Sequence, residues 1–246
     1  MGSAEECVGD GGRGAESRTH GDVWRMNYFA HAVPFLDEPY VVAGTGVPDW
    51  LSVVDRRCRV RLRDAQRWAG QADGPMRAVA RGLVQHMLDD ARFHGTRAFV
   101  ELRLEFSADC RRHLGQQQGH GASFLGHWLI EVLLDAHLIA ADPGRLDAYY
   151  EALGHIEPAV VQAAVNRMAA RPTEALGATI AAFRRQRILW DYLDDAKLLG
   201  RLNQVLWRVG LARVPESFVG LLPAARRKVA RRSDALLAGL PRWPGH

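Results

Sequence analysis

The sequence predicts an all-α protein, and three observations support this prediction. Apolar residues recur at helical spacing over long stretches, most clearly in residues 75–94 and 124–140. Glycine and proline separate these stretches at intervals typical of loops between helices. A strand-like alternation appears only in residues 57–69, where Cys58 and Val60 alternate with polar residues.

The elements follow in order along the chain. Residues 26–48 are interrupted by proline and glycine and predict short helix and loop, after which a helix covers about 49–55. Pro75 lies near the start of a long helix that continues through His94. Gly95 ends or kinks that helix before the next one. The remaining expected helices cover about 96–114, 124–140, 144–153, 157–170, 173–199, 200–211 and 216–238, with a loop at 115–123 and Ser123 as a candidate cap.

Composition places the chain among ordinary globular proteins. Of its 246 residues, 48% are hydrophobic and 24% are charged, which suits one large domain or two small ones. We expect residues 1–25, which are polar and glycine-rich, to form a disordered extension. Residues 26–238 are expected to form a single helical domain, and residues 239–246 a flexible tail.

Net charge, cysteine content and hydropathy argue against several classes of protein and of binding partner. The net charge of +4 is mildly basic and suits a phosphorylated or acidic partner. Three cysteines without CxxC spacing argue against a disulfide framework and a thiolate zinc site, and favour a reducing, cytoplasmic compartment. The longest apolar run is interrupted by charged residues and histidine, so no membrane span is expected. No nucleic-acid-binding motif accompanies the basic residues, so no nucleic-acid partner is expected.

Histidine and aspartate share one face of the predicted helix that ends near residue 94. His86, Asp90 and His94 are each four residues apart, and four residues make just over one helical turn. The neighbouring Asp89 is expected to support these side chains or to be exposed. Taken alone, the stripe also fits a solvated face stabilised by pairs of side chains one turn apart.

A second stripe occurs on the helix predicted over 124–140. His127, Glu131 and Asp135 again lie four residues apart, and the residues around them are almost all apolar. A helix that is apolar nearly all round is buried. Buried carboxylates without partners would cost several kcal/mol each, and a bound cation removes that cost.

Two stripes of this kind predict a metal site between helices. Imidazole and carboxylate ligands without thiolate suit Zn, Mn, Fe, Co or Mg. The number of candidate ligands favours two divalent ions, and pairs of ions catalyse phosphoester hydrolysis. His31 and Asp49 are further candidate ligands, although His31 alone also fits a hydrogen-bonded core histidine and Asp49 a helix N-cap.

The same residues resemble a known family, the acyl carrier protein phosphodiesterases, a divergent branch of the HD-domain metal-dependent phosphohydrolases. The resemblance lies in MNYFAH at 26–31, GTGVPD at 44–49, the HxxxDxxxH stripe and the later acid/His helix. WDYLDDAKLLGRLNQVLWRVG at 190–210 is similar to the C-terminal helical region of the family. The resemblance spans about 26–230.

The resemblance implies an HD-like helical bundle with a buried metal site. The positions that match the metal-binding pattern of the family are His31, Asp49, His86, Asp90, His94, His127 and Glu131. Met87 stands where the family usually has Arg, and His94 takes a position that is usually Asp. His127 and Glu131 stand where the family prefers two aspartates.

We therefore expect hydrolysis of a phosphodiester or phosphomonoester with two divalent ions, Mn, Fe, Zn or Mg. His94 and Asp135 are expected to serve as ligands or as the general acid and base, and Arg92 or Arg97 to offset developing charge. The substrate is a phosphoester, with an acidic carrier protein as a candidate partner. One alternative is a hydrolase like zinc-dependent phospholipase C and its related nucleases, because an HxxxE pair on an apolar helix is similar to theirs.

A second alternative is a non-catalytic helical metal-binding protein. Its basic face would dock an acidic partner. The candidate residues for that face are Arg184, Arg185, Arg187, Arg226, Arg227, Lys228, Arg231 and Arg232. The aromatic residues Trp190, Tyr192 and Trp207 are expected in the core.

Overall fold

The computed structural model describes residues 28–115 and 119–240, and every regular element in these ranges is a helix. The α-helices are α1 (Tyr28–Ala32), α2 (Pro39–Val54), α3 (Leu62–Gln71), α4 (Gly74–Gly95), α5 (Arg97–Leu114), α6 (Gly119–Ala141), α7 (Pro143–Gly154), α8 (Pro158–Met168), α9 (Leu176–Gln186), α10 (Asp195–Arg208), α11 (Leu222–Ala230) and α12 (Ser233–Leu236). The 3-10 helices η1 (Val33–Phe35), η3 (Ile188–Leu193) and η4 (Glu216–Leu221) connect some of them. The all-α prediction is confirmed, and the HD-like arrangement stays a prediction. The predicted extension at 1–25 and residues 241–246 of the predicted tail lie outside the described residues.

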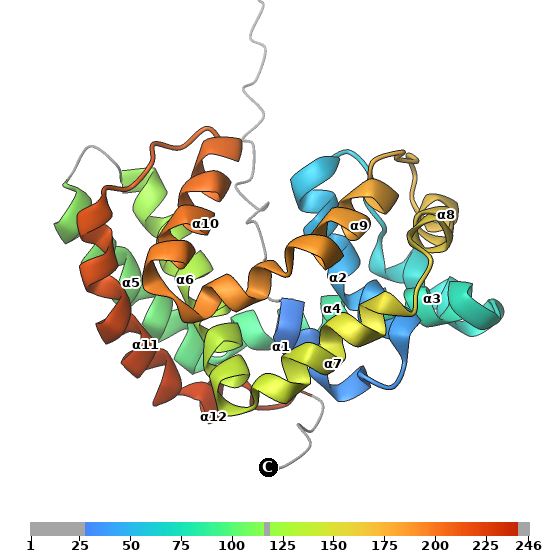
Figure 1. Cartoon of the computed structure of the whole chain (residues 1–246), viewed down its shortest axis with the longest axis horizontal. Coiled ribbons are helices and arrows are strands. Elements are labelled where there is room, and N and C mark those ends of the chain that lie inside the picture. The colour runs from blue at the N-terminus through green and yellow to red at the C-terminus, as the bar shows by residue number, and fades with distance from the viewer. Residues whose placement is uncertain (1–27, 116–118, 241–246) are drawn as a thin grey trace, which may run out of the picture.

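The helices form two groups, with α1 between them (Figure 1). Helices α5, α6, α10 and α11 lie on one side of the view, and α2, α3, α8 and α9 lie on the other. The short helix α1 contacts α2, α4, α6 and α7. Its position explains how the start of the domain brings His31 to side chains of the long helix α4.

The first part of the domain is more helical than the sequence predicts. α2 begins at Pro39 and runs to Val54, whereas the expected helix covered only about 49–55. Proline is tolerated in the first turn, because its missing N–H would have no helical partner there. Pro48 lies inside the helix, at the expense of one backbone hydrogen bond. Asp49 therefore lies within α2, and the N-cap interpretation of this residue is wrong.

Glycines on α2 and α4 allow these two helices to cross at very short range. A Cβ atom at Gly44 would lie 2.4 Å from the Val79 carbonyl oxygen, and one at Gly82 would lie 2.2 Å from the Val41 carbonyl oxygen. Real Cβ atoms do not approach a backbone this closely, so any larger residue forces the helices apart. The crossing sets the position of α4, which carries the first polar stripe.

The substitution Gly82→Ala is expected to destabilise the fold by roughly 1–3 kcal/mol, because the added methyl group overpacks the crossing. The matched control is Gly70→Ala on α3, where nothing lies within 4 Å of the added Cβ. That control is expected to stabilise the protein by about 0.5–1 kcal/mol through helix propensity alone. Urea unfolding of both variants measures the difference, and equal free energies of unfolding would contradict the close approach.

Helix α6 lies in the core, as its apolar sequence predicts. Trp128, Leu133 and Ile139 are all buried. In the described part of the chain one helix, Gly121–Ala141, is long and apolar enough to cross a membrane, but 78% of the tested window is buried inside the protein. The helix begins before the expected loop ends, so Ser123 lies inside α6 and caps nothing.

Two other segments differ from the expectation. The candidate strand at 57–69 is a loop followed by α3, so its alternation does not reflect a strand. The helix expected over 173–199 is divided, because Arg187 adopts the left-handed backbone conformation with a φ of 46° and ends α9. Tyr192 is buried as expected, but Trp207 is 67% exposed on α10, so its core assignment is wrong.

Candidate metal centre

His31, Asp90 and His86 form one compact cluster, which we call the inner group. His31 Nε2 lies 3.5 Å from Asp90 Oδ1, and His86 Nε2 lies 3.1 Å from Asp90 Oδ2. The two imidazole rings are tilted against each other with their centroids 4.4 Å apart. All three side chains are at most 1% exposed. The first stripe therefore meets α1, and the prediction of His31 as a partner of His86 and Asp90 agrees with this arrangement.

A second carboxylate, that of Asp89, contacts His31 at the ring nitrogen opposite Asp90. Asp89 Oδ2 lies 3.4 Å from His31 Nδ1, the ring nitrogen that does not face Asp90. Asp89 is buried, and the Gln85 side-chain amide donates a 2.7 Å hydrogen bond to its other oxygen. Metal-bound histidines usually make this contact through the second ring nitrogen. The role of Gln85 was missed from the sequence, although its spacing of four residues from Asp89 is a signal that could have found it.

Glu131, His94 and His127 form the second cluster, which we call the outer group. Glu131 Oε1 lies 3.0 Å from His94 Nε2 and 2.9 Å from His127 Nε2. The ring of Phe99 on α5 packs against both imidazoles in edge-to-face geometry, with centroid distances of 4.7 and 4.9 Å. The side chain of His94 is 18% exposed, whereas Glu131 is fully buried. The α4 stripe thus reaches the α6 stripe through His94, whereas His86 and Asp90 meet His31 of α1.

Both groups have donor spacings that fit a metal ion. Two ligands at about 2.1 Å from one ion lie roughly 3.0–3.4 Å apart when they subtend angles between octahedral and tetrahedral values. The contacts between imidazole nitrogen and carboxylate oxygen span 2.9–3.5 Å across the two groups. In each group the donor atoms lie within 4.8 Å of one another. Two imidazoles and one carboxylate also form a common catalytic donor set that keeps a further position for water.

Electrostatics in the inner group favour a charged cluster. Burial lowers the pKa of His31, but hydrogen bonds to Asp89 and Asp90 outweigh it and raise the pKa to about 10. Burial opposes ionisation of Asp90, yet His86 and His31 hold the pKa of this carboxyl well below its usual range. A metal ion held by His31 Nε2 and Asp90 would displace the proton that lies between these two side chains.

In the outer group, burial and neighbouring histidines again have opposite effects on the pKa of a carboxylate, here Glu131 alone. Burial raises the pKa of Glu131, but His127 and His94 more than offset this effect and lower the pKa to about 2. Glu131 is therefore an anion at neutral pH and a suitable ligand. The Nε2 atoms of both histidines point at this carboxylate, which favours a ligand role for His94 over a role as general acid.

Asp135, one turn beyond Glu131, holds the start of α1. Its two carboxylate oxygens accept hydrogen bonds of 3.0 and 2.9 Å from the backbone N–H groups of Phe29 and Ala30. Burial raises the pKa of Asp135 to about 7, against the effect of these two hydrogen bonds. The residue predicted as a catalytic group thus anchors the short helix that carries His31.

Asp49 is buried, but it belongs to neither group among the described residues. The pKa values of three buried tyrosines, Tyr28, Tyr149 and Tyr192, are raised well above their usual range, mainly by burial and further by the Asp49 carboxylate. The prediction of Asp49 as a metal ligand therefore gains no support from the geometry of the two groups.

The arginines expected near the site differ in their surroundings. Arg92 Nη1 lies 3.8 Å from Asp89 Oδ1, at the edge of the inner group. Arg97 is exposed and forms an ion pair with Glu101 on its own helix. Arg92 is therefore the better placed of the two to offset charge near the site.

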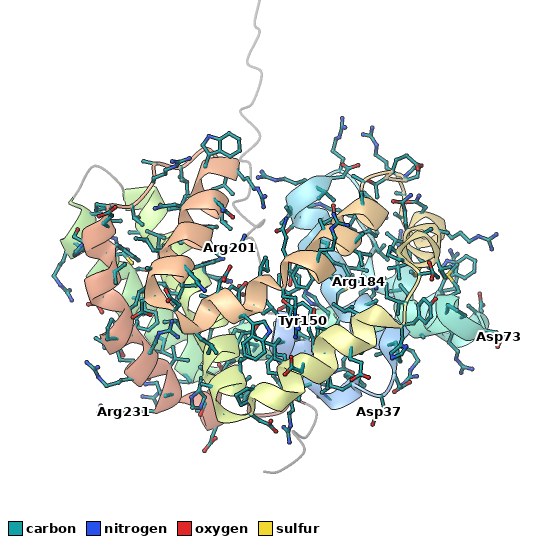
Figure 2. The ribbon with its side chains drawn as sticks, viewed as in Figure 1. Asp37, Asp73, Tyr150, Arg184, Arg201 and Arg231 are labelled. Atoms are coloured by element: carbon teal, nitrogen blue, oxygen red, sulfur yellow. The ribbon has the colours of Figure 1, made fainter. Side chains whose placement is uncertain are left out.

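The predicted basic face is spread over separate elements, and many of its charges are paired. Figure 2 shows Arg184 and Arg231 on different sides of the molecule. Arg226 pairs with Asp195, Lys228 with Glu105 and Asp109, and Arg232 with Glu105, as in ordinary surface ion pairs. This pairing weakens the case for one continuous surface that docks an acidic partner.

Both groups combine imidazole nitrogen and carboxylate oxygen atoms, which α1, α4 and α6 hold in place. Histidine and carboxylate side chains at these spacings could hold a divalent ion. Comparisons of the chain with protein families, with curated proteins and with solved structures found no match.

Proposed function

We propose that this protein is a metal-dependent phosphoric ester hydrolase that acts on a phosphodiester, similar to the acyl carrier protein phosphodiesterases. The observation that carries the proposal is the presence of two groups, each of two histidines and one carboxylate. The groups use Asp90 and His94, which lie on successive turns of α4, about 6 Å apart along the helix. Pairs of metal ions held by neighbouring ligands commonly catalyse phosphoester hydrolysis.

Divalent ions, when bound, would lower the pKa of a water molecule and offset the charge of the phosphoryl oxygens. The protein residues hold the reacting groups in place. Glu131 and Asp90 are anionic ligands, and the paired histidines complete each set. Asp135 fixes α1, so that His31 stays against Asp90, and Asp89 fixes the orientation of the His31 ring. Arg92 adds positive charge at the edge of the site.

Two narrower expectations stay within this proposal. An acidic carrier protein as the substrate depends on the resemblance in sequence, and the mildly basic charge of the chain is compatible with it. A hydrolase like zinc-dependent phospholipase C would use the same donors on a different ester. A cytoplasmic location fits the few unpatterned cysteines, of which Cys58 and Cys110 are buried and free.

A non-catalytic metal-binding protein is the main competing function. The nearly complete burial of the inner group favours this alternative, because closed metal sites are typically structural. The partial exposure of His94 favours hydrolysis, because a catalytic ion needs a position open to substrate. Turnover therefore separates the two functions.

The substitution Glu131→Gln is expected to lower hydrolysis of bis(p-nitrophenyl) phosphate by at least about 100-fold, because it removes the only carboxylate of the outer group while keeping its shape. The measurement compares steady-state rates with and without added Mn²⁺, using protein purified without chelator or metal-affinity resin. The matched control is Glu151→Gln, an exposed glutamate on α7. Turnover that does not depend on metal, or full turnover of Glu131→Gln, would contradict the proposal.

A further inference from the structure

The two groups differ in how far they are enclosed. Each residue of the inner group is at most 1% exposed. In the outer group His127 is 6% exposed and the His94 side chain is 18% exposed. His94 also lies in the last turn of α4, next to Gly95, where the helix ends. Solvent therefore reaches the outer group first.

The groups also differ in the support behind their histidines. His31 is held through Nδ1 by Asp89, which is itself held by Gln85. Within the described part of the chain, the carboxylate that contacts His94 and His127 is Glu131 alone, which is itself a ligand. Carboxylates behind ligand histidines raise metal affinity about 10–100-fold. The inner group is built to hold its ion more tightly.

The carboxylates around the two groups also favour tighter binding of an ion by the inner group. The inner group has two carboxylates, Asp90 in the group itself and Asp89 behind His31, and a buried ion tolerates only a well-balanced surrounding charge. Arg92, which pairs with Asp89, is half-exposed, so solvent screens its charge. Among the described residues, the outer group has one carboxylate, Glu131, and none behind its histidines, so a divalent ion there keeps positive charge. An uncompensated charge next to solvent attracts an anion, such as a phosphoryl group.

We infer that the two metal positions have different tasks: the inner ion is a retained part of the fold, and the outer ion exchanges with solvent and receives the phosphoryl group of the substrate. This inference rests on the proposed metal-dependent hydrolysis. It adds that free divalent metal regulates activity through occupancy of the outer group. The inner group stays filled under conditions that empty the outer one.

The test follows metal content, not activity. The full chain is loaded with Mn²⁺, exposed to dilute EDTA for increasing times, and analysed for Mn per chain by mass spectrometry. The wild-type protein is expected to lose one ion quickly and the other at least about 10-fold more slowly. His94→Ala is expected to retain only the slow ion, and the control His137→Ala, a half-buried histidine on α6, is expected to lose ions in both phases.

Inorganic phosphate is the probe for the charge argument. Calorimetric titration of phosphate into the Mn²⁺-loaded protein is expected to show binding to wild type and at least about 10-fold weaker binding to His94→Ala. The thermal melting temperature of His94→Ala shows whether the variant is folded. If it is not, His94→Gln, which keeps a polar side chain at this partly exposed position, takes its place.

The outcomes separate this inference from the proposed function. Loss of both ions at one rate, loss of the slow ion in the folded His94 variant, or unchanged phosphate binding would overturn the inference. Two distinct rates in a protein without phosphodiester turnover would support the difference in retention between the two metal positions, and would contradict the hydrolase proposal and the role of the outer ion toward substrate. Absence of any bound Mn²⁺ would overturn both.

Discussion

Replacing Asp90 with asparagine is expected to remove the inner metal ion and most of the activity, and to destabilise the fold. Asp90 is buried and contacts both His31 and His86. Without its charge, the buried imidazolium at His31 loses one of the two carboxylates that stabilise it. Removing one partner of a buried ion pair costs roughly 3–5 kcal/mol, and removing a ligand lowers metal affinity by more than about 100-fold.

Metal content by mass spectrometry and urea unfolding in the presence of chelator measure the two effects separately. Asp37→Asn is the matched control, because Asp37 is exposed before α2 at the edge of the molecule (Figure 2). Asp89→Asn is expected to give an intermediate loss of metal affinity, about 10–100-fold, because Asp89 acts through His31. An Asp90→Asn protein with full metal content and wild-type stability would show that the inner group is not a metal site.

The second large effect is expected for Asp135→Ala. Both oxygens of Asp135 accept hydrogen bonds from the backbone at the start of α1. The substitution removes the carboxylate that accepts from two buried N–H groups, and losing such an acceptor costs about 1–3 kcal/mol per group. We expect roughly 2–6 kcal/mol of destabilisation, together with weaker metal binding by the inner group, because α1 carries His31.

Asp73→Ala is the control for this substitution. Asp73 also precedes a helix, α4, but its side chain makes no capping hydrogen bond there and it lies at the outer edge of the molecule (Figure 2). Its replacement is expected to change the free energy of unfolding by less than about 0.5 kcal/mol. Equal effects of the two substitutions in urea unfolding would mean that Asp135 does not anchor α1.

The polar stripes were predictable because helical periodicity is a local property. A spacing of four residues places His86, Asp90 and His94 on one face wherever the helix lies. The apolar surroundings of His127 and Glu131 likewise predict burial without knowledge of the fold. For these residues the sequence was enough to predict the shared helix faces and the burial of His127 and Glu131.

The pairing between stripes depended on tertiary structure and was not predictable in the same way. His31 could be proposed as a ligand, but its approach to Asp90 follows from the position of α1 between α4 and α6. The role of Asp135 depends on backbone N–H groups 105 and 106 residues away. A local sequence pattern cannot predict a contact between residues so far apart in the chain.

The start of α2 was missed for a different reason. Glycine and proline in residues 39–48 lower helix propensity, so the segment favoured a loop. Packing of Gly44 against the backbone of α4 outweighs that propensity, and a larger residue would not fit. The same misjudged start led to the N-cap interpretation of Asp49, which lies inside the helix.

The central claim is that two metal ions bind between α1, α4 and α6. Anomalous X-ray diffraction from crystals soaked in Mn²⁺ tests it most directly, because it locates each ion. The account predicts two peaks, one among His31, His86 and Asp90 and the other among His94, His127 and Glu131. Peaks absent from both positions in crystals that contain Mn²⁺ would contradict it.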